Sequence, residues 1–457
     1  MDPIFIASDP AAAIPIWFVT AENYSELREQ LEPRARAFAD AAGFEPRPGK
    51  SLVLPGESGL SAVLFGLEGA SDARDPFLPG RLPERLPDGI YRFANEPHDA
   101  RLATLAFALA TYRFGRYRKA ERHAVQLDLP QSVNREELEC IVEAVTLARD
   151  LINTPANDMG PAELEEAAHA LAARHGAAVG AVVGDDLLAG NFPLIHAVGR
   201  AAARPPRLID LQWGEVDHPR VTLVGKGVCF DSGGLDIKPD ASMLNMKKDM
   251  GGAATALALA HMVMSRRLKV RLRVLIPAVE NAISGAAFRP RDVYTSRKGI
   301  TVEIGNTDAE GRLILADALA LADEDNPALI ADFATLTGAA RVALGPDVPA
   351  FFTNDDKLAH DLAHYAATEN DPLWRMPLWR PYESMLESKV ADINNVGSGG
   401  QAGAITAALF MRRFVTAGSW LHFDIFAWTP AAKPGRPEGG ELQAARALYA
   451  LLAERYG

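Results

Sequence analysis

Short apolar runs, separated by polar and glycine-rich connectors, recur along the C-terminal two-thirds of the chain. Runs rich in β-branched and aromatic residues predict strands at residues 221–225, 270–278, 300–305, 329–333 and 420–428. Helical spacing predicts helices at residues 251–265, which are rich in alanine, and at residues 311–323, which Pro327 terminates. This alternation predicts an α/β domain with a mixed, largely parallel sheet that is flanked by helices.

The first 130 residues have a different pattern, in which short apolar stretches stand among connectors rich in proline and glycine. We predict a smaller N-terminal α/β domain there, with no cluster of polar residues that suggests chemistry. An amphipathic pattern over residues 134–153 follows Pro130 and ends before Pro155, which predicts a helix between two domains. The expected organisation is therefore an N-terminal domain over residues 1–130, a linker helix over residues 131–153 and a larger domain over residues 154–457.

Composition narrows the possible partners and the compartment. The 457 residues suffice for two domains, and 47 Lys and Arg against 59 Asp and Glu leave a net charge of −12, which opposes binding to nucleic acid or to an anionic membrane. Two cysteines, Cys140 and Cys229, are too few for a disulfide scaffold. The N-terminal segment lacks a basic region, and no apolar run reaches the roughly 18–20 residues of a membrane span. We therefore expect a cytoplasmic protein without a membrane partner.

Polar residues gather after two of the predicted strands, where ligands bind in open α/β sheets. Lys226, Asp231 and Asp249 follow the first strand, and Asp308 and Glu310 lie between the third strand and the next helix. Four carboxylates carry a charge of −4 that would match two divalent cations, and such a cluster would repel itself without them. Taken alone, an acidic pair before a helix favours simple capping and a lysine after a strand favours a solvated side chain. The combination, with glycines on both sides, favours a two-cation site.

Three other classes of site match the sequence less well. Gly225 and Gly227 flank a lysine after a strand, but neither glycine-rich phosphate-binding motif surrounds them. Ser232 lacks the G-x-S-x-G turn of a serine hydrolase. His360 and His364 have the spacing of a zinc-binding helix, yet an aspartate stands where the catalytic glutamate belongs, so we interpret this stretch as a solvated helix face.

Three longer segments carry a family resemblance. The segments VGKGVCFDSGGLDIKP (224–239), MKKDMGG (246–252) and NTDAEGRL (306–313) closely resemble the signature segments of the leucyl aminopeptidase family, also called cytosol aminopeptidases. The similarity extends over residues 145–457 and is weak in the N-terminal part. The resemblance implies a dinuclear metallo-aminopeptidase that acts on peptides, with residues 154–457 as its catalytic domain.

Matching the motifs residue by residue implies a ligand set. Lys226, Asp231, Asp249 and Glu310 would hold one metal ion, and Asp231, Asp308 and Glu310 would hold the other. Lys226 can ligate a metal only as a neutral amine, and both burial and adjacent dications favour that form. Carboxylate-rich sites with one amine ligand accept Mn²⁺, Zn²⁺ or Mg²⁺ to different degrees, so we expect two divalent cations, Mn²⁺ or Zn²⁺.

The same matching implies catalytic and substrate-binding residues. Lys238 would stabilise an oxyanion, and Arg312 would position a bicarbonate ion that acts as general base. Met246, Thr335 and Gly338 would line the pocket for the first side chain of the peptide. Their apolar and small surfaces suit a hydrophobic, leucine-like residue, although one methylene changes discrimination by only about 1–3 kcal/mol.

The resemblance also implies a homohexamer, built as a trimer of dimers. Some family members bind DNA, a role that the charge of −12 opposes here. All seven metal-binding and catalytic positions are intact, which disfavours an inactive scaffold. One departure stands out, because Phe426 and Trp428 replace the smaller residues of many family members and alter either the cleft, a subunit contact or only the packing of a core strand.

Overall fold

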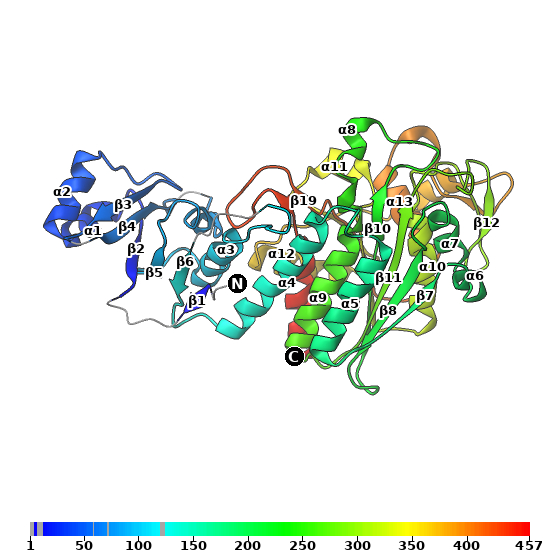
Figure 1. Cartoon of the computed structure of the whole chain (residues 1–457), viewed down its shortest axis with the longest axis horizontal. Coiled ribbons are helices and arrows are strands. Elements are labelled where there is room, and N and C mark those ends of the chain that lie inside the picture. Colours follow the sequence, from blue (N-terminus) through cyan, green and yellow to red (C-terminus); the bar gives the residue numbers. More distant parts are fainter. Residues whose placement is uncertain (1–3, 7–11, 58, 71–72, 119–123) are drawn as a thin grey trace. The chain divides into compact units, whose positions relative to one another are not determined.

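A computed structural model describes residues 4–6, 12–57, 59–70, 73–118 and 124–457 (Figure 1). The chain divides into two compact units. The first comprises Met1–Glu143 together with Ala431–Glu438, and the second comprises Ala144–Pro430 together with Gly439–Gly457. Among the described residues, no helix combines the length and the apolar character that a bilayer span requires.

The first unit is built on a six-stranded sheet. In spatial order its strands are β1 (Phe5–Ile6), β6 (Val125–Asp128), β5 (Gly89–Phe93), β2 (Ile14–Val19), β4 (Leu60–Gly66) and β3 (Ser51–Pro55). Only β3 runs antiparallel to its neighbour. Its helical segments are α1 (Tyr24–Gln30), α2 (Pro33–Ala41), η1 (Leu78–Arg81) and α3 (Ala100–Ala110). The predicted N-terminal α/β fold is confirmed.

A short segment from the C-terminal part of the sequence, residues 431–438, belongs to the first unit rather than to the second. Gly435 packs so tightly that a β-carbon there would lie 3.1 Å from the Cα atom of Ala106. The Arg436 guanidinium lies 5.5 Å from the ring centre of Phe77. The sequence-based division assigned this segment to residues 154–457, because nothing in its composition shows which core it packs against.

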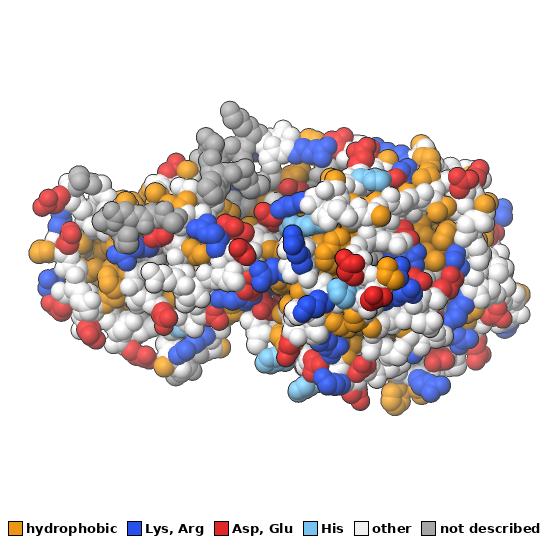
Figure 2. Space-filling view, turned by 90° about the horizontal axis from the view of Figure 1, so that it is seen from below, with side chains coloured by type: hydrophobic (Ala, Val, Ile, Leu, Met, Phe, Trp, Pro, Cys, Tyr) orange, Lys and Arg blue, Asp and Glu red, His pale blue; other side chains and the backbone are white. Residues whose placement is uncertain are grey.

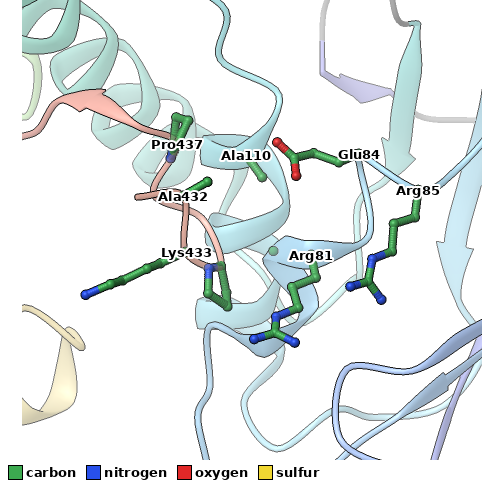
Figure 3. A pocket seen from close by; sticks show the side chains of 9 residues that line it. Arg81, Glu84, Arg85, Ala110, Ala432, Lys433 and Pro437 are labelled. Atoms are coloured by element: carbon green, nitrogen blue, oxygen red, sulfur yellow. The ribbon is translucent and has the colours of Figure 1, made fainter. Parts of the chain in front are cut away.

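A cavity of about 250 Å³ lies in this unit beside the same segment (Figure 3). Arg81, Glu84 and Arg85 line it from one stretch of chain, and Lys433 lines it from the returning segment. The Nη1 atom of Arg85 donates a hydrogen bond to the Gly49 carbonyl, 2.5 Å away. None of the site residues predicted from the sequence lines this cavity.

The helix predicted over residues 134–153 is present as α4 (Arg135–Asn153). Its first turn carries Glu136 and Glu137, where negative charge favours the helix dipole. The side chain of Asn134 accepts a hydrogen bond from the Glu137 backbone, 3.1 Å away, and thereby caps this end. The boundary between the two units falls inside α4, after Glu143.

The second unit is built on a nine-stranded mixed sheet. Its main path is β16 (Trp374–Arg375), β15 (Ala350–Phe352), β18 (Trp420–Asp424), β14 (Leu329–Ala334), β9 (Arg220–Gly225), β11 (Arg271–Asn281), β8 (Arg207–Trp213) and β7 (Ala178–Val183), and β10 (Gly227–Asp231) also pairs with β11. Strands β18, β14, β9, β11 and β10 run parallel to one another, whereas β7, β8 and β15 pair antiparallel. The predicted mixed, largely parallel sheet is confirmed.

Helices cover both faces of this sheet, and Figure 1 shows α5 and α9 along one face and α7 and α10 along the other. The helical segments of the unit are α5 (Pro161–His175), α6 (Asp186–Ala189), α7 (Pro193–Gly199), α8 (Asp240–Met243), η2 (Met246–Met250), α9 (Gly251–Ser265), α10 (Gly311–Glu324), α11 (Gly338–Leu344), α12 (Asp356–Thr368), η3 (Arg380–Leu386), η4 (Ser398–Gly400), α13 (Gly403–Arg412) and α14 (Ala445–Tyr456). Helices α9 and α10 match the predicted ranges closely. Nearly all of α9 is buried, which explains its alanine-rich composition.

Two predicted strands differ from the observed ones. The strand expected over residues 300–305 is β13 (Thr301–Glu303), and it belongs to a separate small sheet with β12 (Val293–Thr295) and β17 (Ile393–Asn394). The strand expected over residues 420–428 ends at Asp424 and is followed by β19 (Trp428–Thr429), which pairs with β20 (Gly439–Gly440). The break arises because Ala427 has a φ of +56° and its backbone N–H donates to the Gln443 side chain.

On the face shown in Figure 2, Lys and Arg side chains are interspersed with Asp and Glu side chains. The net charge of −12 is therefore not gathered into one patch on that face.

Candidate active site

The predicted site lies where several elements of the second unit end. Lys226 follows β9, Asp231 ends β10, and Asp249 stands in η2 directly before α9. Asp308 and Glu310 lie in the turn between β13 and α10. The structure brings all five residues together, at the strand ends where the sequence predicts them.

Glycines allow α9 to approach the sheet closely enough to bring Asp249 to Lys226. A β-carbon on Gly252 would lie 2.1 Å from the carbonyl oxygen of Phe333, and one on Gly225 would lie 2.6 Å from the Cα atom of Ala253. Neither position tolerates a larger residue without movement of the backbone. The glycines that follow Asp249 in the sequence therefore serve the packing that forms the site.

Lys226 is the centre of one half of the cluster. Its Nζ atom lies 2.8 Å from Asp249 Oδ2 and 2.9 Å from Glu310 Oε1, and it donates to the Thr335 carbonyl, 3.0 Å away. The hydroxyl of Thr335 donates to Asp249 Oδ1 at 2.7 Å. Lys226, Asp249 and Glu310 are buried, so these charges interact with little screening by water.

Lys238 is the centre of the other half. Its Nζ atom lies 2.8 Å from Asp231 Oδ2 and also pairs with Asp308 Oδ1. The second oxygen of Asp231 accepts hydrogen bonds from the Gly233 backbone at 2.8 Å and from Asn281 Nδ2 at 2.9 Å. Asn281 ends β11 and is buried, and sequence reasoning missed it. Its position as a polar residue at the end of an apolar strand is the signal that could have identified it.

The donor set fits divalent cations. Asp231, Asp308 and Glu310 each offer one oxygen, and these oxygens lie within 4.8 Å of one another. Glu310 Oε2 is buried and accepts no hydrogen bond from the described residues. Buried carboxylate oxygens that lack donors are costly unless a cation neutralises them. Converging oxygen donors with one amine are a suitable ligand set for Mn²⁺ or Zn²⁺.

The electrostatics of the cluster depend on burial and on the number of acidic groups. Burial, with the neighbouring charge of Asp231, raises the pKa of Glu310 to about 8. The same two causes raise the pKa of Asp308 to about 6. Burial opposes the ammonium form of Lys226, but Asp249 and Glu310 outweigh it and raise the pKa of this lysine. A divalent cation would reverse that balance, because positive charge beside Lys226 favours the neutral amine.

Arg312 lies in the first turn of α10 and is buried. Its Nη1 atom donates to the Asn395 carbonyl at 2.7 Å, whereas its buried Nε–H has no acceptor among the described residues. Burial lowers the pKa of this guanidinium to about 10, against the opposing effect of Glu310. Asn395 also accepts hydrogen bonds from the backbone of Gly305 and Asn306, at 2.7 and 3.2 Å, and so shapes the loop before Asp308. Sequence reasoning missed Asn395, which lies far along the chain from that loop.

A cavity of about 490 Å³ opens onto the cluster. The predicted residues that line it are Lys226, Asp231, Asp249, Asp308, Lys238, Arg312, Met246, Thr335 and Gly338. Glu310 does not line the cavity and joins the cluster through its ion pair with Lys226. Phe426 lines the cavity and Trp428 does not, so of the two bulky replacements only Phe426 changes the shape of the cleft.

Two basic residues that the sequence analysis did not predict also line this cavity, Lys248 and Arg341. The Lys248 ammonium lies 4.5 Å from the ring centre of Phe426. Burial lowers the pKa of Lys248 to about 8; the charges of Lys226 and Arg341 act in the same direction, and those of Asp249 and Asp424 oppose it.

Comparisons with known proteins agree with this geometry. Residues 146–449 match the model of the cytosol aminopeptidase family, catalytic domain, and residues 14–130 match that of the M17 aminopeptidase, N-terminal domain. The chain belongs to the cytosol aminopeptidase family. Membership confirms the prediction of a metal-dependent aminopeptidase.

Individual relatives extend the comparison. A probable cytosol aminopeptidase of Syntrophotalea carbinolica is 41% identical over 368 residues, which are 76% of this chain and 73% of the relative. One of Chlamydia trachomatis is 47% identical over 294 residues, 63% of this chain and 58% of the relative. The crystal structure of a cytosol aminopeptidase from Coxiella burnetii has a TM-score of 0.94 and 47% identity, and the match covers 99% of this chain and 100% of the other. The bottromycin maturation enzyme BotP in complex with Mn has a TM-score of 0.86 and 32% identity, over 97% and 99%.

The structure of this cytosol aminopeptidase family member gives other roles to the residues of two alternative sites. His360 and His364 are exposed on α12, whose Leu358 and Leu362 face the core, as expected of a solvated helix face. Asp361 pairs with Lys357 at 2.8 Å. The hydroxyl of Ser232 donates to the Asn281 carbonyl at 2.8 Å, a structural role that leaves its side chain tied to the backbone.

Proposed function

We propose that this aminopeptidase releases N-terminal residues from peptides by means of two divalent cations. The observation that carries the proposal is the convergence of Lys226 with four carboxylates in one buried cluster beside a cavity. Lys226, Asp231, Asp249 and Glu310 would hold one cation, and Asp231, Asp308 and Glu310 the other. Bound there, two cations supply a polarised substrate carbonyl and a water whose pKa falls towards neutrality.

Selectivity for the end of a peptide follows from the need for a free amine beside the proposed cations. An amine binds a cation only in its neutral form, and an N-terminal amine, with a pKa of about 7.7–8.0, reaches that form near neutral pH. A peptide has such a group at its first residue, whereas internal peptide bonds present only amides. The side chain of Asp308, in the cavity wall, is the most exposed carboxylate of the cluster.

Lys238 would stabilise the negative charge that develops on the substrate carbonyl oxygen. Burial opposes its ammonium form, but Asp231 and Asp308 outweigh this effect and raise the pKa of Lys238. A lysine that stays charged is suited to an oxyanion. Its ion pairs hold the side chain at the cavity wall before the substrate binds.

Arg312 would position a bicarbonate ion that takes a proton from the attacking water. A planar guanidinium matches the oxygens of such an anion, and the Nε–H of Arg312 is available as a donor. The bond from Nη1 to Asn395 fixes the guanidinium at the cavity wall.

The first side chain of the peptide would bind between Met246, Thr335 and Gly338, which line the cavity beside Asp249. The apolar surface of Met246 and the open space around Gly338 suit a hydrophobic, leucine-like residue. The known complex of BotP with Mn supports Mn²⁺ as one choice of metal, and Zn²⁺ is the other that the ligand set suits.

We also propose a cytoplasmic homohexamer that acts on peptides and binds neither membranes nor nucleic acid. The family resemblance supports the hexamer. The two buried cysteines support a cytoplasmic location, and the charge of −12 disfavours binding to anionic membranes and to nucleic acid. Light scattering tests the assembly, and a monomeric mass would overturn it. A salt-dependent mobility shift with duplex DNA tests the exclusion of nucleic acid.

The central test is hydrolysis of leucine p-nitroanilide and of a Leu-X dipeptide. Activity is measured as purified, after chelation with removal of the chelator, and after Mn²⁺ or Zn²⁺ is returned. We expect chelation to abolish activity and one of the two metals to restore it. Activity that survives complete removal of metal would exclude the mechanism.

A further inference from the structure

We propose that Lys248 and Arg341 form a subsite for a carboxylate on the first side chain of the peptide, so that the enzyme accepts N-terminal Glu or Asp. The proposal rests on the proposed function and widens its substrate class beyond leucine-like residues. The two side chains line the same cavity as the metal-binding cluster, and sequence motifs did not identify either of them.

Lys248 is a buried cation that no carboxylate contacts directly among the described residues. The residue is 6% exposed, and its ammonium forms no hydrogen bond or ion pair with the part of the chain that the structure describes. Its contact is with the face of Phe426, 4.5 Å from the ring centre. A cation–π contact offsets only part of the cost of removing an ammonium from water. The ammonium is therefore available to form an ion pair with an anion that binds in the cavity.

Arg341 adds a second incompletely paired cation. Its Nε and Nη1 atoms are buried and have no acceptor among the described residues. Its Nη2 atom donates to the Asp424 carbonyl and lies 3.5 Å from Asp424 Oδ1. The Asp424 carboxylate is already committed to Thr337, whose hydroxyl donates to it at 2.6 Å. The other carboxylate whose charge acts on Lys248 is Asp249, which already pairs with Lys226, so Lys248 and Arg341 keep a net positive charge.

The positions of the two cations identify which part of a peptide they would meet. Arg341 lies one helical turn after Gly338 in α11, and positions three apart on a helix share a face, so Arg341 lies beside the pocket proposed for the first side chain. Lys248, in η2, lines the same cavity as Met246 and contacts Phe426, which also lines it. The carboxylate that reaches Lys248 and Arg341 is accordingly that of the first side chain.

The cavity thus combines two sets of groups. The cations that Asp249 and Asp308 would help to hold bind the amino group in its neutral form, and Lys248 and Arg341, beside Phe426, attract a carboxylate. A Glu or Asp residue at the start of a peptide carries both groups. Glutamine has nearly the same shape as glutamate but no charge, so it isolates the electrostatic contribution.

The test compares kcat/KM for the p-nitroanilides of Glu, Gln and Leu on the metal-loaded enzyme. We expect a Glu/Gln ratio of about tenfold or more, because Gln leaves a buried charge unpaired. Lys248→Met should bring the ratio close to one, and Lys248→Arg should restore most of it. The ratio is taken within each variant, so changes in folding or metal content cancel.

Lys247→Met is the matched control, because it removes the neighbouring ammonium, which donates to the Asn153 carbonyl at 2.7 Å and does not line the cavity. It should keep the wild-type Glu/Gln ratio.

If the wild-type enzyme hydrolyses leucine p-nitroanilide with a Glu/Gln ratio near one, the subsite is overturned and the proposed function stands. If it hydrolyses none of the substrates, the proposed function itself is overturned. An effect of Lys248→Met on Leu-Ala relative to Leu-alaninamide, with the Glu/Gln ratio unchanged, would show that the lysine binds the C-terminal carboxylate and would also overturn the subsite.

Discussion

The Nζ atom of Lys226 lies 2.8 Å from Oδ2 of Asp249, and both side chains are buried. Lys226 follows β9 and Asp249 precedes α9, so this contact joins the end of a central strand to the start of the helix that covers it. A lysine buried among carboxylates keeps its proton, whereas a lysine that ligates a cation must lose it. Binding of the proposed cations would therefore exchange protons for metal.

Glu310→Gln should lose nearly all turnover and most of the bound metal. Glu310 is shared between the two proposed cations, and the amide of glutamine has one weaker oxygen donor and no charge. Metal content after gel filtration, measured by elemental analysis, and hydrolysis of leucine p-nitroanilide test this together. A variant that binds metal with wild-type stoichiometry would show that Glu310 is not a ligand.

Metal affinity should rise with pH between about 6 and 8. Burial and Asp231 raise the pKa of Glu310 to about 8, so below that pH the carboxyl holds a proton that a cation must displace. Lys226 contributes in the same direction, because its pKa is raised and its ligating form is the neutral amine. Calorimetric titration with Mn²⁺ in buffers of different ionisation enthalpy measures the protons released. Binding without proton release at pH 7 would contradict this prediction.

Lys238→Ala should keep the metal and lose rate. The lysine pairs with Asp231 and Asp308 but is proposed to act on the substrate oxyanion, and loss of one such donor costs about 10²–10³ in kcat. Metal content and kcat for leucine p-nitroanilide are the two measurements. If the variant also loses its metal, Lys238 holds the cluster together rather than stabilising the oxyanion.

Local sequence pattern predicted much of the fold. Helix α9 is predominantly apolar and nearly all buried, and α10 begins at a glycine and ends before Pro327, so both were predicted closely. The place of β13 in a separate sheet could not be predicted, because its pairing with β17 joins residues 302 and 393. The packing of residues 431–438 in the first unit could not be predicted for the same reason, because the sequence of a polar segment does not indicate which distant residues it contacts.

The candidate site could be predicted as far as its residues lie in continuous motifs. Lys226, Asp231 and Asp249 stand within one stretch of sequence, and strand ends bring that stretch to Asp308. Lys248 stands in the same stretch, yet its meaning depends on Phe426 and Arg341, which are distant in sequence. Isolated polar residues of this kind acquire a role only through tertiary contact.

Gly252→Ala should disrupt the metal site indirectly, by displacing α9 from the sheet. A β-carbon at this position would lie 2.1 Å from the Phe333 carbonyl oxygen and 2.8 Å from the Lys226 backbone nitrogen, so α9 must move away from β9 and β14. Overpacking of this kind costs typically about 1–3 kcal/mol of stability, and it would also separate Asp249 from Lys226. Denaturant unfolding and metal titration test both effects.

Gly180→Ala is the control, because a β-carbon there meets nothing within 4 Å. This variant should keep the wild-type metal affinity, and its stability should change only by the small effect of the substitution itself. A Gly252→Ala variant with wild-type metal affinity would mean that the close approach of α9 is not what positions Asp249.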